Sequence, residues 1–176
     1  MIKKINNLKI FFEEPEKEFH LREIARIMNK NPVTIKRFLD EFVKKGILFL
    51  KKERKFHLYS SNSESPDYKE LKRQYNKEKL IDSGLIDFLK KEFNLPTIIL
   101  FGSFEKGEDN KNSDIDMCII SETKKEIFIE KYEKIINKKI QLHIFNHEEF
   151  KKLKIKNKDL FINVINGYKL SGLLEI

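Results

Sequence analysis

The sequence predicts an α+β protein in two parts, and three observations lead to this prediction. Residues 1–60 contain several stretches with apolar residues at helical spacing. Residues 97–121 hold two short apolar runs separated by a polar loop, a pattern typical of neighbouring buried strands. The charge is also uneven, because the first 60 residues carry 15 Lys and Arg against 8 Asp and Glu, whereas the rest carry 21 against 20. A basic first part indicates a polyanionic partner.

Length and composition limit the class of protein. A chain of 176 residues is long enough for one large domain or two small ones. It contains neither a long apolar segment nor a signal-peptide pattern, so we expect a cytoplasmic protein with no membrane partner. The one cysteine, Cys118, lies in a predicted buried strand. It therefore excludes an internal disulfide, and a core residue is a better interpretation than a nucleophile.

The first part of the chain predicts three helices followed by a hairpin. Apolar stripes predict helices at residues 2–13 and 20–28, and a third begins where Asn31 caps a helix with Pro32 at its first position. Gly46 is expected to end this third helix. Two short apolar strands, residues 47–50 and 56–59, flank a charged hairpin tip.

This order of elements resembles a winged helix-turn-helix domain. In such domains the third helix enters the major groove of duplex DNA, and the hairpin lies along the phosphate backbone. The alternatives are a protein-docking module and a merely solvated basic face. The resemblance implies DNA contacts from the exposed side of the third helix and from the hairpin, namely Thr34, Lys36, Arg37, Lys44, Lys51, Lys52, Arg54 and Lys55.

A polar loop marks the boundary between the two parts. Residues 60–65 are rich in Ser and precede Pro66, and residues 68–93 then follow a helical pattern that Gly84 interrupts or kinks. We predict a first domain at residues 1–62, a linker helix at residues 63–79 and a second domain at residues 80–176.

The second part is organised around a Gly-Ser pair and two aspartates. Gly102 and Ser103 end the first apolar run, and Ser103 is expected to cap a following helical turn whose N–H groups face a phosphate. Asp114 and Asp116 precede the second apolar run and, on a strand, point to one face. Two such carboxylates repel each other unless a cation lies between them. Oxygen ligands of this kind suit Mg²⁺, with Mn²⁺ as an alternative.

These four residues resemble the motif of the nucleotidyltransferase superfamily that includes DNA polymerase beta, and in particular its minimal nucleotidyltransferase branch. The resemblance covers about residues 80–172. It implies a small mixed β-sheet with helices on one side, binding of a nucleoside triphosphate, with ATP expected, and transfer of a nucleoside monophosphate to a hydroxyl group on a protein, an RNA or a small molecule.

The remaining elements follow the order of that family. Residues 124–137 predict a helix, residues 139–145 a strand, and residues 147–155 and 158–166 two helices, the last ended by Gly167. The inward side of the first of these helices is predicted to be Ile127, Phe128, Tyr132, Ile135 and Ile136, and that of the strand Ile140, Leu142 and Ile144.

One position departs from the family pattern. Active members carry a third carboxylate on the strand at residues 139–145, and the resemblance places Gln141 there. An amide cannot take a proton from the attacking hydroxyl group and is a poorer metal ligand. His143 shares the strand face and could accept a proton, although an ordinary surface histidine is the better interpretation.

Three hypotheses about function remain open. The first is a nucleotidyltransferase guided by the winged helix, resembling the antitoxin members that modify a partner toxin. The second is a DNA-binding regulator whose second domain has lost turnover because of Gln141. The third is a pair of docking domains, which the retained Asp114 and Asp116 disfavour. A homodimer is expected in either of the first two cases, because a single winged helix binds DNA weakly.

Overall fold

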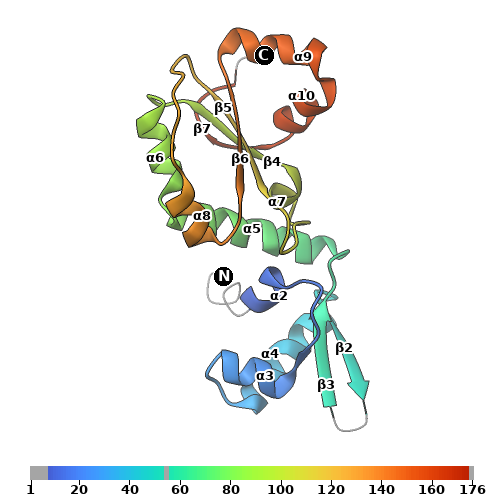
Figure 1. Cartoon of the computed structure of the whole chain (residues 1–176). Coiled ribbons are helices and arrows are strands. Elements are labelled where there is room, and N and C mark those ends of the chain that lie inside the picture. Colours follow the sequence, from blue (N-terminus) through green and yellow to red (C-terminus); the bar gives the residue numbers. More distant parts are fainter. Residues whose placement is uncertain (1–7, 54–55, 175–176) are drawn as a thin grey trace. The chain divides into compact units, whose positions relative to one another are not determined.

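The computed structural model describes residues 8–53 and 56–174. The chain divides within one long helix, α5 (Pro66–Asp82), into two compact units, Met1–Tyr75 and Asn76–Ile176 (Figure 1). Each unit has its own hydrophobic core.

The first unit combines short helices with a small antiparallel sheet of strand order β1-β3-β2. The cap predicted at Asn31 is confirmed, because its side chain accepts a hydrogen bond from the N–H of Val33 at 2.8 Å. Gly46 follows the third helix with φ +69°, as expected of a helix end. The elements are α2 (Lys9–Glu13), β1 (Phe19–His20), α3 (Leu21–Ile27), α4 (Pro32–Lys44), β2 (Leu48–Glu53) and β3 (Phe56–Ser61).

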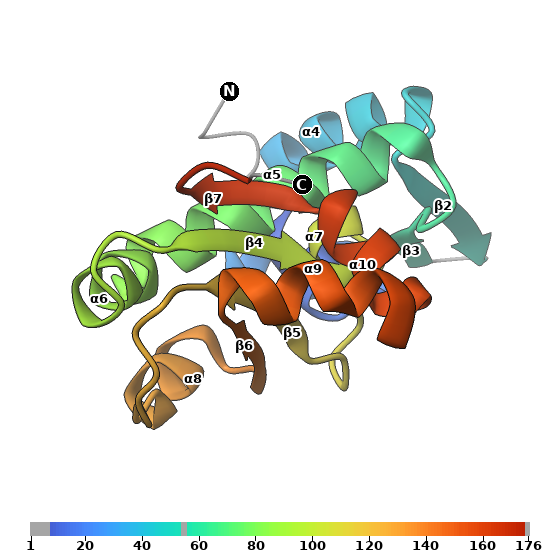
Figure 2. The same ribbon diagram turned by 90° about the horizontal axis from the view of Figure 1, so that it is seen from above.

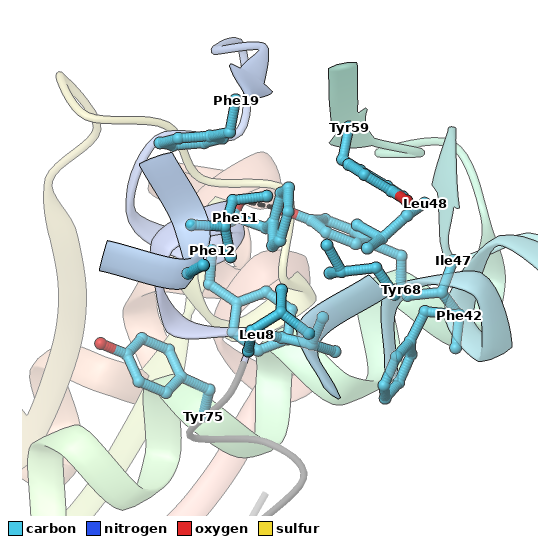
Figure 3. Packing of buried hydrophobic residues seen from close by; sticks show 14 residues of the cluster. Leu8, Phe11, Phe12, Phe19, Phe42, Ile47, Leu48, Tyr59, Tyr68 and Tyr75 are labelled. Atoms are coloured by element: carbon cyan, nitrogen blue, oxygen red, sulfur yellow. Dashed lines mark hydrogen bonds between the residues drawn. The ribbon is translucent and has the colours of Figure 1, made fainter. Parts of the chain in front are cut away.

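Aromatic side chains fill the core of the first unit (Figure 3). Phe11 and Phe19 meet edge to face with ring centroids 5.3 Å apart. The carbonyl of Phe11 accepts hydrogen bonds from the hydroxyl groups of Ser61 and Tyr68, at 3.0 and 2.8 Å. These hydrogen bonds connect the end of the hairpin and the start of α5 to α2. They also provide partners for polar groups that are buried in the apolar core.

Some details of this unit were not predicted. The two-residue strand β1 pairs with β3 at Phe19 and His20, although nothing in its sequence separates it from the following helix. Both hairpin strands extend further than expected, because β2 continues to Glu53 and β3 to Ser61. The predicted helical residues 2–7 and the two predicted DNA contacts Arg54 and Lys55 lie outside the described residues.

The second unit is built on a mixed four-stranded sheet of order β6-β5-β4-β7, and Figure 2 labels its four strands. Strands β5 and β6 are parallel, whereas β4 pairs antiparallel with both β5 and β7. After α5 the elements are α6 (Leu85–Glu92), β4 (Thr97–Phe101), α7 (Gly102–Lys106), β5 (Ile115–Ile120), α8 (Glu130–Ile136), β6 (Ile140–Phe145), α9 (His147–Lys156), α10 (Lys158–Ile165) and β7 (Tyr168–Ser171).

Helices cover both faces of this sheet, so the prediction of helices on one side was wrong. Side chains alternate along β4, and this places Ile98 and Leu100 in the core with α6 and α8. The same alternation places Ile99 and Phe101 in a second core with α9 and α10. A strand that is apolar at every position has two faces to bury, which the run at residues 98–101 already indicated.

Two further expectations differ from the structure. The helix predicted at residues 124–137 is confined to α8, and Phe128 and Ile135 are exposed rather than inward. Lys124 and Lys125 instead bind Glu149 and Glu92 from an irregular segment. Strand β7 was not predicted, and it completes the sheet beside β4. In the described part of the chain, no helix is both long enough and apolar enough to span a membrane.

Candidate functional site

The centre of the candidate site is the close approach of Gly102 to Asp116. Phe101 at the end of β4 pairs with Asp116 on β5, so the next residue passes directly beside this carboxylate. Gly102 adopts φ +77°, and a Cβ added to it would lie 2.4 Å from Oδ2 of Asp116. Both the backbone angle and the lack of space require glycine here. The Gly-Ser motif thus keeps the chain close to the carboxylate.

The three polar residues of the candidate site share one face of the sheet. On β5, Ile115 and Met117 point into the core with α6 and α8, so Asp116 between them points to the opposite face. On β6 the same alternation applies, because Ile140, Leu142 and Ile144 belong to that core. Gln141 and His143 therefore lie on the same face as Asp116.

Gln141 is the direct neighbour of Asp116 across the parallel pair of strands. The register pairs Asp116 with Gln141, and Cys118 with His143. The position that the family resemblance assigned to a third carboxylate is therefore adjacent to the aspartate pair, and it holds an exposed amide. His143 is half-buried against the ring of Phe101, with centroids 5.5 Å apart.

Electrostatics at Asp116 favour a cation. Its carboxyl group is half-buried, and this burial raises its pKa above the ordinary value. His143 opposes the shift, whereas the negative charge of Asp114 adds to it. A positive ion between the two carboxylates would relieve both the desolvation and the repulsion.

Asp114 lies in the loop before β5, which corrects the expectation that both aspartates belong to the strand. The strand begins at Ile115, and Asp114 is exposed. Lys138 holds this loop: its ammonium group donates to the carbonyl oxygens of Asn110 and Ser113 and pairs with the buried carboxylate of Asp109 at 3.2 Å. Sequence reasoning missed Lys138, because its spacing from the motif carries no signal.

The expected cap by Ser103 is not observed. Helix α7 begins at Gly102, two residues earlier than a cap at Ser103 would require, so Ser103 lies inside the first turn instead of capping it. The residue before the helix, Phe101, has no side-chain acceptor. The hydroxyl group of Ser103 and the first N–H groups of α7 still belong to the turn of chain that begins at Gly102, beside Asp116.

A divalent metal ion fits this site if the aspartates and a bound phosphate share its coordination. Within residues 8–53 and 56–174, no group of three or more His, Cys, Asp and Glu side chains is arranged to hold an ion by itself. Asp116 lies directly beside Gly102, and Asp114 is close enough for its charge to add to the effect of burial in raising the pKa of the Asp116 carboxyl group. Such a pair suits Mg²⁺, which keeps several waters and takes its other ligands from phosphate oxygens.

The residues predicted to contact DNA differ in their availability. On α4, Thr34 and Arg37 are exposed, whereas Lys36 forms an ion pair with Asp40 one turn later. Hydrogen bonds from Lys36 and Tyr59 help hold the pKa of Asp40 below its ordinary value against the opposing effect of burial. In the hairpin, Lys51 pairs with Glu53 at 2.8 Å, and Lys52 is exposed.

Comparison with known proteins agrees with the geometry of the second unit. Residues 82–164 match the family model of the nucleotidyltransferase domain. The match spans β4, α7, β5, α8 and β6, which are the elements that carry the candidate site. It supports a nucleotidyltransferase domain in this part of the chain. Neither a curated protein nor a solved structure gives a significant match to the chain.

Proposed function

We propose that the second unit binds a Mg²⁺–nucleoside triphosphate, with ATP the expected nucleotide, and transfers its nucleotidyl group to a hydroxyl group. The observation that carries this proposal is the approach of Gly102 to Asp116, because a side chain at residue 102 would fill the space beside the carboxylate. In this proposal Asp114 and Asp116 would hold the metal, which would neutralise the charge that develops on the phosphates.

The reaction forms a bond between the acceptor oxygen and the α-phosphorus. The bond from the α-phosphorus to the oxygen that bridges to the β-phosphorus breaks, and pyrophosphate leaves with that electron pair. The proton of the acceptor hydroxyl group must also leave. Gln141, which lies beside Asp116, cannot accept it, so it passes to water or to His143. The absence of a carboxylate base predicts slow turnover.

We further propose that the first unit is a winged helix-turn-helix domain that binds duplex DNA. The order α3, a short turn, α4 and a hairpin supports this, with Asn29 at φ 49° in the turn. Arg37 and Thr34 on the exposed side of α4 are available to a DNA groove, and Lys52 is available to a phosphate. The excess of basic residues in the first 60 residues agrees with this role.

A second candidate function rests on one specific observation, the amide of Gln141 beside Asp116. In this case the second unit binds the nucleotide without turnover, and the protein is a DNA-binding regulator that senses it. Both candidates require the same nucleotide site, and they differ in whether pyrophosphate is released.

Titration calorimetry tests the nucleotide site without knowledge of the acceptor. Each of the four nucleoside triphosphates is titrated with Mg²⁺ into the wild type, Asp116→Asn and the control Asp87→Asn. Asp87 is an exposed α6 residue whose ion pair with Lys90 lies outside the site. We expect Mg²⁺-dependent binding to the wild type and to Asp87→Asn, and loss of binding in Asp116→Asn. Equal binding by Asp116→Asn would show that the site is elsewhere, and no binding by the wild type would overturn the proposal.

A further inference from the structure

A polar groove of about 580 Å³ opens beside Asp114, on the side of the sheet that ends with β6. We name it the lysine groove. Its size is that of a small-molecule site. Its walls are the loop before β5, helix α8 and the turn that leads into β6, with the side chains of Lys111, Asn112, Ser113, Asp114, Glu130, Glu133, Lys134, Asn137, Lys138 and Lys139.

The position of the groove separates it from the proposed nucleotide site. In the strand order β6-β5-β4-β7, Gly102 follows β4, whereas the groove lies beyond β5, where β6 begins. Asp114 immediately precedes the strand between them and lines the groove, whereas Asp116 lies on that strand and points to the face opposite α8. A group in the groove would therefore approach the proposed metal site from the side of Asp114.

The charges of the groove leave two lysines available to a ligand. Lys138 is held by Asp109, and Lys139 by Glu133 at 3.2 Å. Glu133 is engaged in turn, because the N–H of Ile140 donates to it at 2.9 Å and is the main cause of its lowered pKa.

Asp114 belongs to the proposed metal site. Lys111 and Lys134 are exposed, and no ion pair with another described residue is found for either of them. The available charge in the groove is thus positive, apart from Glu130.

The side chains that line the groove do not resemble a binding site for another protein. All the lining side chains are polar or charged. The centre of a protein–protein interface is usually apolar and aromatic, and lysine is depleted there. The groove also offers no aromatic ring on which a base could stack. What it offers is ammonium groups and amides, which bind phosphate and sugar oxygens without regard to base identity.

We propose that the lysine groove binds the acceptor, and that the acceptor carries phosphate groups close to the hydroxyl group that receives the nucleotide. This inference rests on the proposed function, since it assigns the second substrate of the same site. Two sources share this chemistry, the end of a single-stranded RNA and a small sugar phosphate. Lys111 and Lys134 would bind its phosphates, and Asp114 would lie next to its hydroxyl group.

The first test compares two charge-matched double variants of the full chain. In Lys111→Gln/Lys134→Gln the groove loses two positive charges, and in Lys151→Gln/Lys154→Gln the exposed surface of α9 loses the same charge outside the groove. Fluorescence anisotropy measures binding of a labelled 12-nucleotide RNA as salt is raised. We expect the groove variant to bind more weakly and its logarithmic salt slope to flatten by about 1.4, while the control keeps the wild-type slope. Equal slopes in both variants would overturn the proposal.

The second test locates the bound RNA, because the basic first unit is a competing site. A photoreactive 4-thiouridine at the 3′ end is cross-linked to the wild type, and the linked peptides are identified by mass spectrometry. Cross-links within residues 111–139 support the groove, whereas cross-links confined to residues 8–61 overturn it. Ribose 5-phosphate is added as competitor: displacement of the RNA from the groove assigns a small acceptor, and its failure to displace assigns a polymer.

The two proposals fail in different ways. If the wild type binds Mg²⁺–ATP but RNA neither cross-links to the groove nor shows the expected salt dependence, the acceptor proposal is wrong and the nucleotide site stands. If RNA occupies the groove but no nucleoside triphosphate binds, the proposed function is wrong, and with it the assignment of the groove to an acceptor.

Discussion

Asp116 on β5 and Gln141 on β6 are paired residues of two parallel strands, and their side chains lie on the same face of the sheet. A carboxylate at residue 141 would therefore stand beside the aspartate pair. Gln141→Asp supplies this acid, and Gln141→Asn is the matched control with the same length and no charge. We expect Gln141→Asp to release pyrophosphate about 10²–10⁴-fold faster than the wild type, since this is the usual contribution of a general base.

The measurement is Mg²⁺-dependent pyrophosphate release from ATP in the presence of RNA or ribose 5-phosphate. Gln141→Asn should remain at the level of the wild type. An increase in both variants would show that loss of the glutamine side chain, rather than gain of an acid, is responsible. No increase in Gln141→Asp would favour the regulator without turnover.

Gly102 is predicted to be indispensable for nucleotide binding. Gly102→Ala introduces a Cβ 2.4 Å from Oδ2 of Asp116 on a backbone with φ +77°, whereas Gly84→Ala meets nothing within 4 Å at φ +76°. Both substitutions carry the cost of a left-handed alanine, about 1–2 kcal/mol. We expect only Gly102→Ala to lose binding of Mg²⁺–ATP in calorimetry, with both variants folded by circular dichroism. Loss of binding in Gly84→Ala as well would assign the effect to general destabilisation.

Lys138 is predicted to stabilise the loop that carries Asp114. Removing it breaks an ion pair with the carboxylate of Asp109, whose side chain is 3% exposed and which also accepts a hydrogen bond from Asn76. Breaking such a buried pair from one side costs about 3 kcal/mol. We expect Lys138→Met to lower the free energy of unfolding in urea by this order, and Lys138→Met/Asp109→Asn to recover part of the loss. Lys139→Met is the neighbouring control, since its pair with Glu133 is exposed on the lysine side and contributes little.

The buried thiol of Cys118 is expected to make the stability of the protein depend on pH. Burial raises the pKa of this thiol from 9.0 to about 12. The unfolded chain therefore loses the proton first, and the free energy of unfolding of the wild type falls as the pH rises from about 9 towards about 12. We expect the wild type to be more stable than Cys118→Ala at pH 8, and this difference to shrink by pH 10.5. Parallel unfolding curves at both values would contradict the prediction.

Arg37 is predicted to contribute more to DNA binding than its neighbour Lys36. Arg37 is exposed on α4, whereas Lys36 is already paired with Asp40. We expect Arg37→Ala to weaken binding of duplex DNA by about tenfold, as for loss of one good base or phosphate contact. Lys36→Ala should have a smaller effect, and Lys154→Ala on α9 none. Unchanged affinity in Arg37→Ala, measured by anisotropy at fixed salt, would remove α4 from the DNA interface.

The sequence was sufficient to predict the local features, because interactions between residues close in the chain determine them. The cap at Asn31, the end of α4 at Gly46, the strands around Gly102 and the buried Cys118 all follow from patterns within a few residues. The interruption at Gly84 is such a feature too, since only Ser83 and the left-handed Gly84 separate α5 from α6. By contrast, the helix expected at residues 124–137 is shorter, and Lys124 and Lys125 in its predicted first turns pair with Glu149 and Glu92 from an irregular segment.

Contacts between distant segments were decided only by the tertiary structure. Sequence spacing could identify Gly102, Asp114 and Asp116, but the register of three strands places Gln141 beside Asp116 and brings Gly102 within reach of its carboxylate. Lys138 and the lysine groove carry no motif at all. Their roles depend on the fold bringing the turn before β6 against the loop before β5, and no local propensity records a contact between residues so far apart in the chain.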